Sequence, residues 1–326
     1  MKNIVVTGAS SLLGINTIVS LLKEDYVVKG FLRNKDKFIG GENPNLKLIE
    51  GDIRSLEDLD KVTTNCDCVI HAAAITDQNL LKYEDYYEVN VECVKNIVNA
   101  AIKNRVKKII YVSTASEFAQ TDLGVLGNET SILEYPFNKS FYIKSKKEAH
   151  DFLLTKLNEI EVTIVNPSFI IGAFDTKPSS GKIVLMGLKN KIVFCPPGGK
   201  NFVCATDVSK GIISAIKKGR NGESYLLANQ NISFLDFFKL LRKLTRNKFL
   251  IIKLPKKILL LIGYMGSVLK GLGVKTNFSL ENMKTISINN FYSNNKAVTE
   301  LDIVFKPIEN GIKDSIFWFE QFKVNS

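Results

Sequence analysis

The stretch that decides the fold lies close to the start of the chain, where residues 4 to 14 read Ile4-Val5-Val6-Thr7-Gly8-Ala9-Ser10-Ser11-Leu12-Leu13-Gly14. An apolar, β-branched run ends there in a glycine turn, and Ile15, Ile18 and Leu22 then continue at helical spacing. Glycine lets a backbone approach phosphates closely, while a helix N-terminus offers free N–H groups and the positive end of its dipole. The stretch therefore predicts a strand, a phosphate-binding turn and a helix, which together open a dinucleotide-binding unit.

The rest of the N-terminal half repeats this alternation of short apolar runs and longer helical patterns. The runs are continuously apolar, which is typical of parallel strands covered on both faces. The clearest helical pattern covers residues 84–103, where apolar residues recur at helical spacing. We therefore expect an α/β fold with a Rossmann-type doubly wound parallel sheet over residues 1–170. The predicted strands are residues 3–7, 27–32, 46–50, 68–71, 108–113 and 161–166.

After Pro167 the rhythm of the sequence changes, because prolines and glycines cluster at residues 178–181 and 196–199. Residues 171–326 are interpreted as a smaller, C-terminal substrate-binding lobe, with some of the chain returning to the Rossmann core. Ser233 and Asp236 resemble a capping box at the start of one helix. Helices are predicted at residues 207–218, 233–246 and 308–322.

Residues 256–270 form a separate helical pattern, in which the wholly apolar run Ile258–Ile262 is flanked by lysines. Fewer than about 17 apolar residues are too few to span a bilayer. The preferred interpretation is a buried or lobe-covering helix. The alternative is an interfacial helix on a membrane surface with anionic lipids, since basic amphipathic helices bind there.

The composition is that of an ordinary globular protein: 45% of the 326 residues are hydrophobic and 24% are charged. The first predicted strand begins directly after Met1 and Lys2, which leaves no room for a signal peptide, and the five cysteines lack paired spacing. We therefore expect reduced cysteines and a cytoplasmic localisation. The net charge of +11 favours anionic partners, yet the basic residues are scattered and form no groove-reading module, so nucleic acid is not an expected partner. No cluster of His, Cys and carboxylates indicates a metal site.

The cofactor preference is predicted from the end of the second strand. NAD-binding versions of the fold place an acidic residue about 20 residues after the glycine turn, where it binds the ribose 2′-hydroxyl. Here the sequence is Phe31-Leu32-Arg33-Asn34, without a carboxylate. Arg33, with Lys35 nearby, is able to pair with the 2′-phosphate of NADP, although an arginine after a strand can also be a solvated loop residue. NADP(H) is therefore expected in preference to NAD(H).

Tyr142 and Lys146 are four residues apart, hence neighbours on one helix face. A tyrosine titrates near pH 10, and an adjacent ammonium would lower its pKa by favouring the phenolate. Ser113 and Thr114 end a predicted strand, where open α/β sheets bind their ligands. One of these hydroxyls would orient a substrate carbonyl. A Tyr-x-x-x-Lys pair alone occurs by chance in many helices, but here it follows the glycine turn and the strand-end hydroxyl in order.

With these motifs the chain resembles the extended short-chain dehydrogenases/reductases of the NAD-dependent epimerase/dehydratase family. Within that family it is most similar to dihydroflavonol-reductase-like proteins and related sugar epimerases. The resemblance covers almost the whole chain. It is carried by residues 7–14, Gly51-Asp52, His71 to Ala74, Asn90-Val91, Tyr111 to Thr114, Tyr142 to Lys146, Asn166 to Ser168, and Asn294 to Ala297 before Glu300-Leu301.

The resemblance implies a role for each matching residue. Tyr142 would be the acid/base, Lys146 its pKa tuner and a ribose ligand, and Thr114 the carbonyl-orienting hydroxyl, with Ser113 as the alternative. Asp52 would hold the adenine. The other cofactor-binding residues that it implies are Gly8, Ser10, Ser11, Leu12, Leu13 and Gly14 at the pyrophosphate, Ile53 beside Asp52, Ala72, Ala73 and Ala74 along the cofactor, and Pro167, Ser168 and Phe169 beside the nicotinamide.

The sequence also departs from the family pattern. Ser11 replaces the middle glycine, Cys93-Val94 replaces the usual Gly-Thr, and Phe118-Ala119 replaces a common Tyr-Gly. Ser11 makes the phosphate loop slightly less permissive. The two histidines are given no catalytic role: His71 is expected to be structural and His150 exposed.

These residues predict an NAD(P)-dependent oxidoreductase that reduces a ketone or aldehyde, or oxidises an alcohol, of a small molecule. One alternative is a sugar-nucleotide epimerase, so the substrate class is a carbonyl compound or a sugar derivative. A 4,6-dehydratase is disfavoured because Ala115-Ser116 follows Thr114 where an acidic pair is usual. The second alternative is a non-catalytic NADP-binding regulator, which the intact Thr114, Tyr142 and Lys146 argue against. Whether the chain forms a homodimer is left open.

Overall fold

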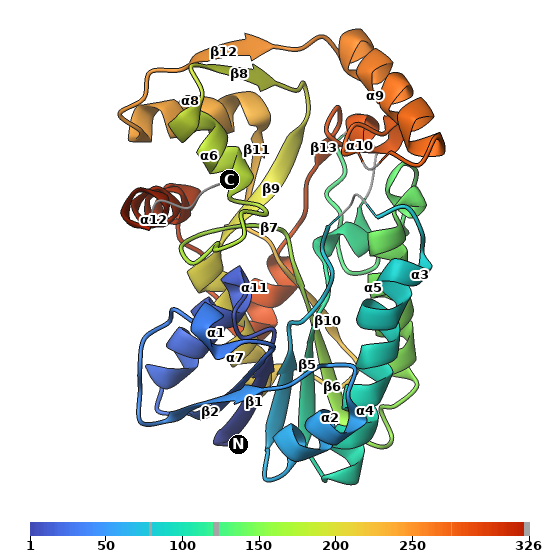
Figure 1. Cartoon of the computed structure of the whole chain (residues 1–326), viewed down its shortest axis with the longest axis vertical. Helices are drawn as coiled ribbons and strands as arrows, with labels where there is room; N and C mark the ends of the chain where they lie inside the picture. Colours follow the sequence, from blue (N-terminus) through green and yellow to red (C-terminus); the bar gives the residue numbers. More distant parts are fainter. Residues whose placement is uncertain (78–79, 120–123, 275, 323–326) are drawn as a thin grey trace.

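Seven parallel strands form the main sheet of the protein, in the order β10-β6-β5-β4-β1-β2-β3 (Figure 1). The structure is a computed structural model that describes residues 1–77, 80–119, 124–274 and 276–322. The predicted α/β class and parallel sheet are confirmed, and the predicted strands differ from the observed ones only at the ends of β5 and β6. The strands are β1 (Asn3–Thr7), β2 (Val27–Leu32), β3 (Leu46–Glu50), β4 (Cys68–His71), β5 (Lys108–Val112), β6 (Glu161–Pro167) and β10 (Ser224–Leu227).

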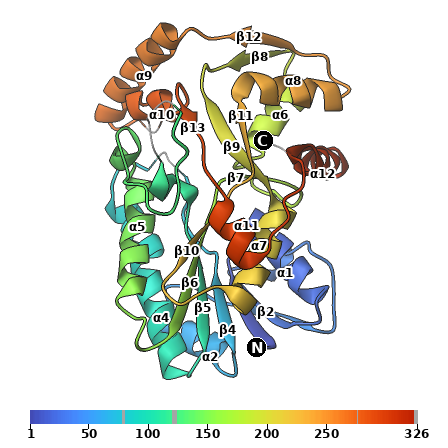
Figure 2. The same ribbon diagram turned by 180° about the vertical axis from the view of Figure 1, so that it is seen from behind.

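Helices cover both faces of this sheet, and alternate residues of each strand face opposite layers. In β1, Ile4 and Val6 belong to the core under α1 and α7, whereas Val5 belongs to the core under α2, α4 and α5. Figures 1 and 2 show these two helical layers on opposite sides of the strands. The helices are α1 (Leu12–Leu22) and α7 (Ala205–Lys218) on one face, and α2 (Leu56–Thr63), α4 (Cys93–Lys103) and α5 (Phe141–Leu154) on the other.

The predicted helix over residues 84–103 is one helical run with a change of pitch inside it. It consists of α3 (Glu84–Tyr87), a π-helical segment η2 (Glu88–Glu92) and α4. Single-turn π segments widen a helix locally and are frequent at functional sites. This one carries Asn90, whose contacts are described below.

The second half of the chain builds a separate apolar core around Phe202, Phe237, Phe238 and Trp318. Its predicted helix at residues 233–246 begins after Ser233, whose hydroxyl caps the Asp236 N–H at 3.0 Å. Two small sheets, β11-β9-β13 with β7 beside β9, and β12-β8, complete this part. The elements are β7 (Phe169–Ile171), α6 (Lys182–Lys189), β8 (Ile192–Cys195), β9 (Gly199–Cys204), β11 (Gln230–Ser233), α8 (Phe234–Leu244), β12 (Leu250–Lys253), β13 (Asn289–Asn290) and α12 (Ile308–Gln321).

Some chain beyond residue 170 lies on the main sheet. The seventh strand, β10, pairs with β6, and α7 packs against α1. Helix α11 (Asn295–Leu301) packs in turn on α7 and β10. The division at residue 170 into a dinucleotide-binding and a substrate-binding part stays a prediction.

Helix α9 (Lys256–Gly271) covers the second lobe but is not buried. Only Leu259, Gly263 and Gly266 are buried, against α10 (Leu280–Thr285) and the segment before it. A Cβ at Gly266 would lie 1.9 Å from the carbonyl oxygen of Phe278, so glycine permits this close packing. Of the predicted interpretation, a buried or lobe-covering helix, α9 is the lobe-covering form. Within the described residues, no helix is both long and apolar enough to cross a membrane.

Candidate active site

The residues implied in cofactor and substrate binding come together at one edge of the main sheet. Tyr142 and Lys146 lie on α5, and the others lie at or just after the carboxyl ends of six parallel strands: β1, β2, β3, β4, β5 and β6. Thr7 lies level with Phe31 of β2 and with His71 of β4, so the segments that follow these strands start side by side. This edge faces the second lobe (Figure 1). It is the place where open α/β sheets bind their ligands.

The glycine turn is built by two close approaches. Gly8 has a φ of +69°, and a Cβ there would lie 2.9 Å from the backbone nitrogen of Ala73. A Cβ at Gly14 would lie 2.1 Å from the carbonyl oxygen of Gly8, so only glycine lets the helix begin this close to the turn. Ser11 caps α1 by accepting the Gly14 N–H at 3.0 Å. Ser11 therefore replaces the family's glycine without disturbing the helix start, and the free N–H groups of this first turn can bind a phosphate.

The turn is also tied to the segment that follows β4. The Thr7 hydroxyl accepts the Ala73 N–H at 3.2 Å and lies 3.1 Å from His71 Nδ1. Ala72, Ala73 and Ala74 thus lie beside the glycine turn, and small side chains there leave space for a cofactor. Burial lowers the pKa of His71 to about 3, so this histidine is neutral and structural, as expected.

Arg33 and Asp52 follow β2 and β3, where the adenosine end of a dinucleotide would lie. Arg33 is exposed, and its charge helps to lower the pKa of Asp52. The main cause is Arg54, whose side chain binds both carboxylate oxygens at 2.6 to 3.1 Å and brings that pKa to about 2. Asp52 would therefore have to exchange this partner to hold an adenine, whereas Arg33 is free to turn toward a phosphate. Ile53 is half-buried and packs on the core under α2.

Tyr142 lies in the first turn of α5, which is capped by Ser140. Burial raises the pKa of the Tyr142 phenol to about 12. The nearby charge of Glu117 also raises this pKa, whereas the Thr114 hydroxyl lowers it. Lys146 is not among the groups that shift this pKa in the protein without cofactor, so its role as the pKa tuner of Tyr142 stays a prediction. Thr114 itself is buried after β5, where its hydroxyl also accepts the Ser116 N–H at 3.3 Å. The phenol and the threonine hydroxyl are thus neighbours at the strand end.

Lys146 is buried one helical turn after Tyr142 and faces β5. Its Nζ donates to the carbonyl oxygen of Val112 at 2.8 Å and lies 4.1 Å from the centre of the Tyr111 ring. Burial lowers the pKa of Lys146 to about 7, although the charge of Glu117 opposes this shift. This lysine is thus a cation that titrates near neutrality.

Asn90, in the π-helical segment, joins the loop after β4 to helix α5. Its side chain bonds both the N–H and the carbonyl of Ile75, at 2.8 and 3.0 Å. Its amide also donates to the hydroxyl of Ser145, which in turn donates to the carbonyl of Tyr142 at 2.8 Å. Asn90 therefore fixes the distance between the segment after β4 and the start of α5.

A buried acid lies beneath this site. Glu117 accepts a hydrogen bond from the hydroxyl of Ser113, and its second oxygen lies 2.7 Å from His150 Nδ1. The other ring nitrogen of His150 lies 3.4 Å from the Ser224 hydroxyl. His150 is buried, so its expected exposure is wrong: the third and fourth turns of α5 face the sheet. Ser113, engaged with Glu117, is a poor candidate for orienting a substrate, which favours Thr114.

The segment after β6 forms the far side of the site. The buried Asn166 donates to the carbonyl of Thr114 at 3.3 Å, while its Oδ1 has no hydrogen-bond partner in the described structure. The Ser168 hydroxyl donates a hydrogen bond to Oδ1 of Asn201 at 2.6 Å. Phe169 packs edge-on against Phe202, and its place beside a nicotinamide stays a prediction.

Lys200, on β9, is a residue that the sequence did not predict. Its Nζ lies 4.5 Å from the centre of the Phe169 ring, and burial lowers its pKa to about 8. The only sequence signal is its place after Pro-Pro-Gly-Gly, which marks a turn and not a ligand. Tyr292, a second unpredicted residue, is buried, and its phenol lies close to Ser116 and Asn290.

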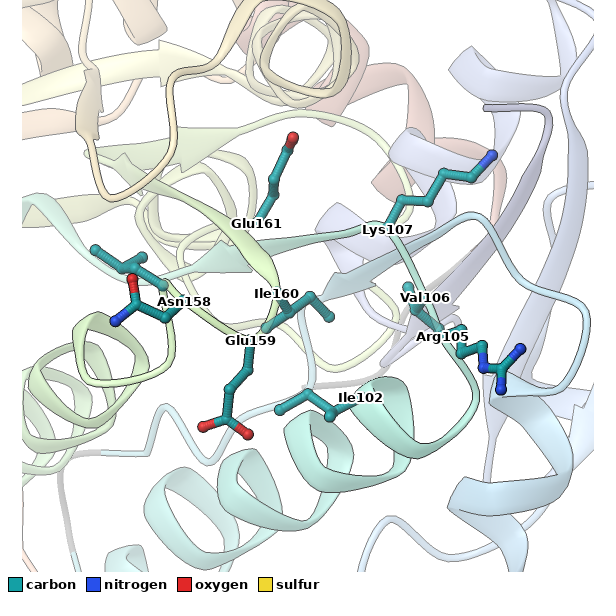
Figure 3. A pocket seen from close by; sticks show the side chains of 9 residues that line it. Ile102, Arg105, Val106, Lys107, Asn158, Glu159, Ile160 and Glu161 are labelled. Carbon is teal, nitrogen blue, oxygen red and sulfur yellow. The ribbon is translucent and has the colours of Figure 1, made fainter.

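The site fits a nicotinamide dinucleotide. The glycine turn and the start of α1 suit a pyrophosphate, the alanines after β4 leave space along the sheet edge, and Asn166 offers an unpaired acceptor. Some hollows of the described surface lie away from these residues. The one in Figure 3, of about 450 Å³, is lined by residues such as Ile102, Val106 and Glu161, at the amino ends of β5 and β6. It lies at the edge opposite to Tyr142.

Comparison with known proteins agrees with this geometry. The family described as "NAD dependent epimerase/dehydratase family" matches residues 4–228. A "Putative dihydroflavonol 4-reductase" from Synechocystis is 26% identical, over 97% of this chain and 94% of its own length. "Sterol demethylase protein B" from Methylococcus capsulatus is 21% identical, over 97% and 98%. Among solved structures, the UDP-glucose 4-epimerase of Thermotoga maritima with UDP-glucose has a TM-score of 0.79 at 19% identity, covering 98% of this chain and 99% of its own.

Proposed function

The chain belongs to the NAD dependent epimerase/dehydratase family, whose members are enzymes that use a nicotinamide dinucleotide, and we propose that it is an NADP(H)-dependent carbonyl reductase. In the reverse direction it would oxidise the corresponding alcohol. The observation that carries the proposal is that Tyr142, in the first turn of α5, and the buried Thr114, directly after β5, lie together at the carboxyl edge of the sheet. This pair supplies one proton donor and one carbonyl-orienting hydroxyl.

The proposed reaction needs one proton and one hydride. A bound reduced nicotinamide supplies the hydride to the carbonyl carbon. Thr114 orients the carbonyl oxygen by donating its hydroxyl, and Tyr142 gives its phenolic proton to that oxygen as the carbon is reduced. The phenolate left on Tyr142 is then reprotonated from solvent. The ammonium of Lys146, one helical turn away, favours the phenolate once it turns from Val112 toward the site.

A dehydratase is disfavoured by the position of the nearest acid. Elimination of water needs a carboxyl group that reaches the substrate, and Glu117 is the first acid after Thr114. Its two oxygens are occupied by Ser113 and His150 beneath the site. Glu117 is therefore not presented beside Tyr142 for this step.

The substrate proposed is an apolar, ring-bearing carbonyl compound. Two relatives that match over nearly the whole chain carry the names of a dihydroflavonol reductase and a sterol demethylase protein. Phe169, which is half-buried, offers an aromatic contact to such a substrate, and Lys200 offers one cation. NADP(H) is preferred in this proposal because Arg33 stands where a ribose-binding acid would bind NAD.

The experiment is a turnover assay of the purified protein with NADPH, against a panel of cyclic ketones and of nucleotide sugars. A reductase consumes NADPH in stoichiometric amounts, and the absorbance of the reduced nicotinamide falls. An epimerase instead converts a nucleotide sugar without net change of that absorbance. The matched control is Tyr142→Phe, which must lose turnover with the same substrate. A non-catalytic regulator would bind NADPH and leave both panels unchanged.

A further inference from the structure

The outward face of α9 is apolar along its whole length. Tyr264, Met265 and Val268 follow Leu261 at helical spacing, and Leu272 continues the stripe one turn later. These five side chains are 50 to 75% exposed, because the buried contacts of α9 are made by its opposite face. Ile258, Ile262 and Leu269 widen the same face and are also exposed. An apolar patch of this extent indicates an interaction surface.

The strand that leads into α9 adds a second apolar area. In the two-stranded sheet β8-β12, Leu250 pairs with Ile192 and Ile252 pairs with Phe194. Paired residues point to the same face of a sheet, and all four of these side chains are exposed. Figures 1 and 2 both show β8, β12 and α9 at the end of the second lobe farthest from the main sheet. The two areas therefore lie at the same end of the molecule.

The net positive charge of the chain is concentrated in the segment of the sequence that contains β12 and α9. Residues 237–280 contain ten lysines and arginines and no aspartate or glutamate, although basic residues occur throughout the sequence. This segment thus accounts for +10 of the net charge of +11, and the remainder of the chain is nearly neutral. Lys253, Lys256 and Lys257 precede the apolar face of α9 and are exposed, and Lys270 lies in its last turn.

We propose that this end of the second lobe, residues 250–272, docks on the surface of a membrane that contains anionic lipids. Lysines beside an apolar helical face match a bilayer interface, where the apolar side chains enter the headgroup boundary and the lysines meet lipid phosphates. A second copy of the chain is disfavoured as the occupant, because a symmetric interface would bring two segments without any acid together. Docking places α9 in the plane of the interface, and the helix does not cross the bilayer.

Docking would bring the lipid surface close to the substrate side of the enzyme. Helix α10, on which α9 packs, contacts η4 (Phe137–Lys139), just before the catalytic helix α5. Lys284 of α10 also hydrogen-bonds the phenol of Tyr135 in the same loop. The proposed surface and the candidate active site thus share one structural unit, while binding to lipid needs neither cofactor nor turnover.

The test is co-sedimentation of the full chain with phosphatidylcholine vesicles, with and without about a third of phosphatidylglycerol. We expect binding to the anionic vesicles, with a partition coefficient that falls more than about tenfold in high salt or in the triple variant Lys256→Gln, Lys257→Gln, Lys270→Gln. The matched control replaces three exposed lysines of the other lobe, Lys61→Gln, Lys103→Gln and Lys147→Gln, and keeps the binding.

The apolar contribution is tested by the double variant Leu261→Glu, Met265→Glu, which changes two exposed side chains and leaves the packed face of α9 intact. We expect it to lose at least about tenfold in partition coefficient, whereas Leu56→Glu with Val304→Glu, also exposed, retains the wild-type value. Equal melting temperatures verify that both variants fold. The proposal is overturned if the wild type does not bind anionic vesicles, if both double variants bind equally, or if Leu261→Glu, Met265→Glu only abolishes a dimer.

Discussion

The ammonium of Lys146 donates a hydrogen bond to the backbone carbonyl of Val112 at 2.8 Å, two residues before Thr114. It therefore bridges the catalytic helix and the strand that carries the substrate-orienting hydroxyl. Replacing Lys146 by methionine keeps the length of the side chain and removes the cation. We expect turnover to fall on the order of 10²–10⁴-fold and cofactor binding to weaken, because the phenolate and the cofactor ribose both lose a partner.

Steady-state kinetics and cofactor titration of Lys146→Met measure these two effects. Lys147→Met is the control, since Lys147 lies on the exposed side of the same helix and pairs with Asp151. The pH optimum of any residual activity should move upward in Lys146→Met only. If Lys146→Met kept wild-type turnover, the four-residue spacing of Tyr142 and Lys146 would have no catalytic meaning.

The same lysine makes the stability of the cofactor-free protein depend on pH. Burial lowers the pKa of Lys146 to about 7, whereas an unfolded lysine titrates near 10.4. Between these values the unfolded state binds more protons, so the contribution of Lys146 to the free energy of unfolding rises as the pH rises from about 7 to about 10. Relative to Lys146→Met, the wild type should gain about 1–4 kcal/mol over this window, measured by urea unfolding. A constant difference would mean that the ammonium is solvated.

Tyr142→Phe removes the phenolic hydroxyl, which is the proposed proton donor, and leaves the rest of the side chain unchanged. We expect turnover to be abolished, while the melting temperature and the affinity for NADPH stay close to wild type, because many other groups hold the cofactor. Tyr26→Phe, at the opposite edge of the sheet, is the control and should keep full activity. Near wild-type turnover in Tyr142→Phe would remove this residue from the catalytic assignment.

Much of the fold and part of the site could be predicted from local sequence. The continuous apolar runs fixed the first six strands, and the order of glycine turn, strand-end threonine and Tyr-x-x-x-Lys placed these motifs at one sheet edge. Strand β10 escaped prediction because it joins the sheet only after strands of the other lobe and helix α7, so its pairing with β6 depends on distant chain. Local pattern does not carry such non-local contacts.

The direction of the pKa shift of Tyr142 could not be predicted from the sequence for a similar reason. The spacing of Tyr142 and Lys146 puts both on one helix face, but it does not say what else faces them. Burial and Glu117 raise the pKa of Tyr142, while Val112 takes the ammonium. His150 illustrates the same limit, because the buried acid that it meets comes from a turn 33 residues earlier in the chain.

Arg33→Ala tests the preference for NADP(H). We expect the variant to weaken NADPH binding by up to about 1.5–3 kcal/mol and to leave NADH binding nearly unchanged, because only the 2′-phosphate would contact the guanidinium. Lys37→Ala, an exposed change in the same loop, is the control. The preference is tested by measuring the dissociation constants of NADPH and NADH at one salt concentration. Tighter binding of NADH than of NADPH by the wild type contradicts the prediction.

Lys200→Met tests the cation on the far side of the site. In the described structure Lys200 has no hydrogen-bond or ion-pair partner, and its Nζ stands over the ring of Phe169. A substrate oxygen at this point would accept a charge-assisted hydrogen bond. We therefore expect the KM for the verified substrate to rise more than about tenfold in Lys200→Met, while kcat and NADPH affinity change little.

The pH dependence of the KM distinguishes substrate binding by Lys200 from a purely structural role of this lysine. Burial lowers the pKa of Lys200 to about 8, so the ammonium is present below that pH and is lost above it. The KM of the wild type should accordingly rise as the pH increases through about 8, and this rise should be absent in Lys200→Met. Lys191→Met, an exposed change just before β8, should keep the wild-type profile. If the KM of the wild type stays constant between pH 7 and 9, or if Lys200→Met retains the rise, substrate does not bind to this ammonium.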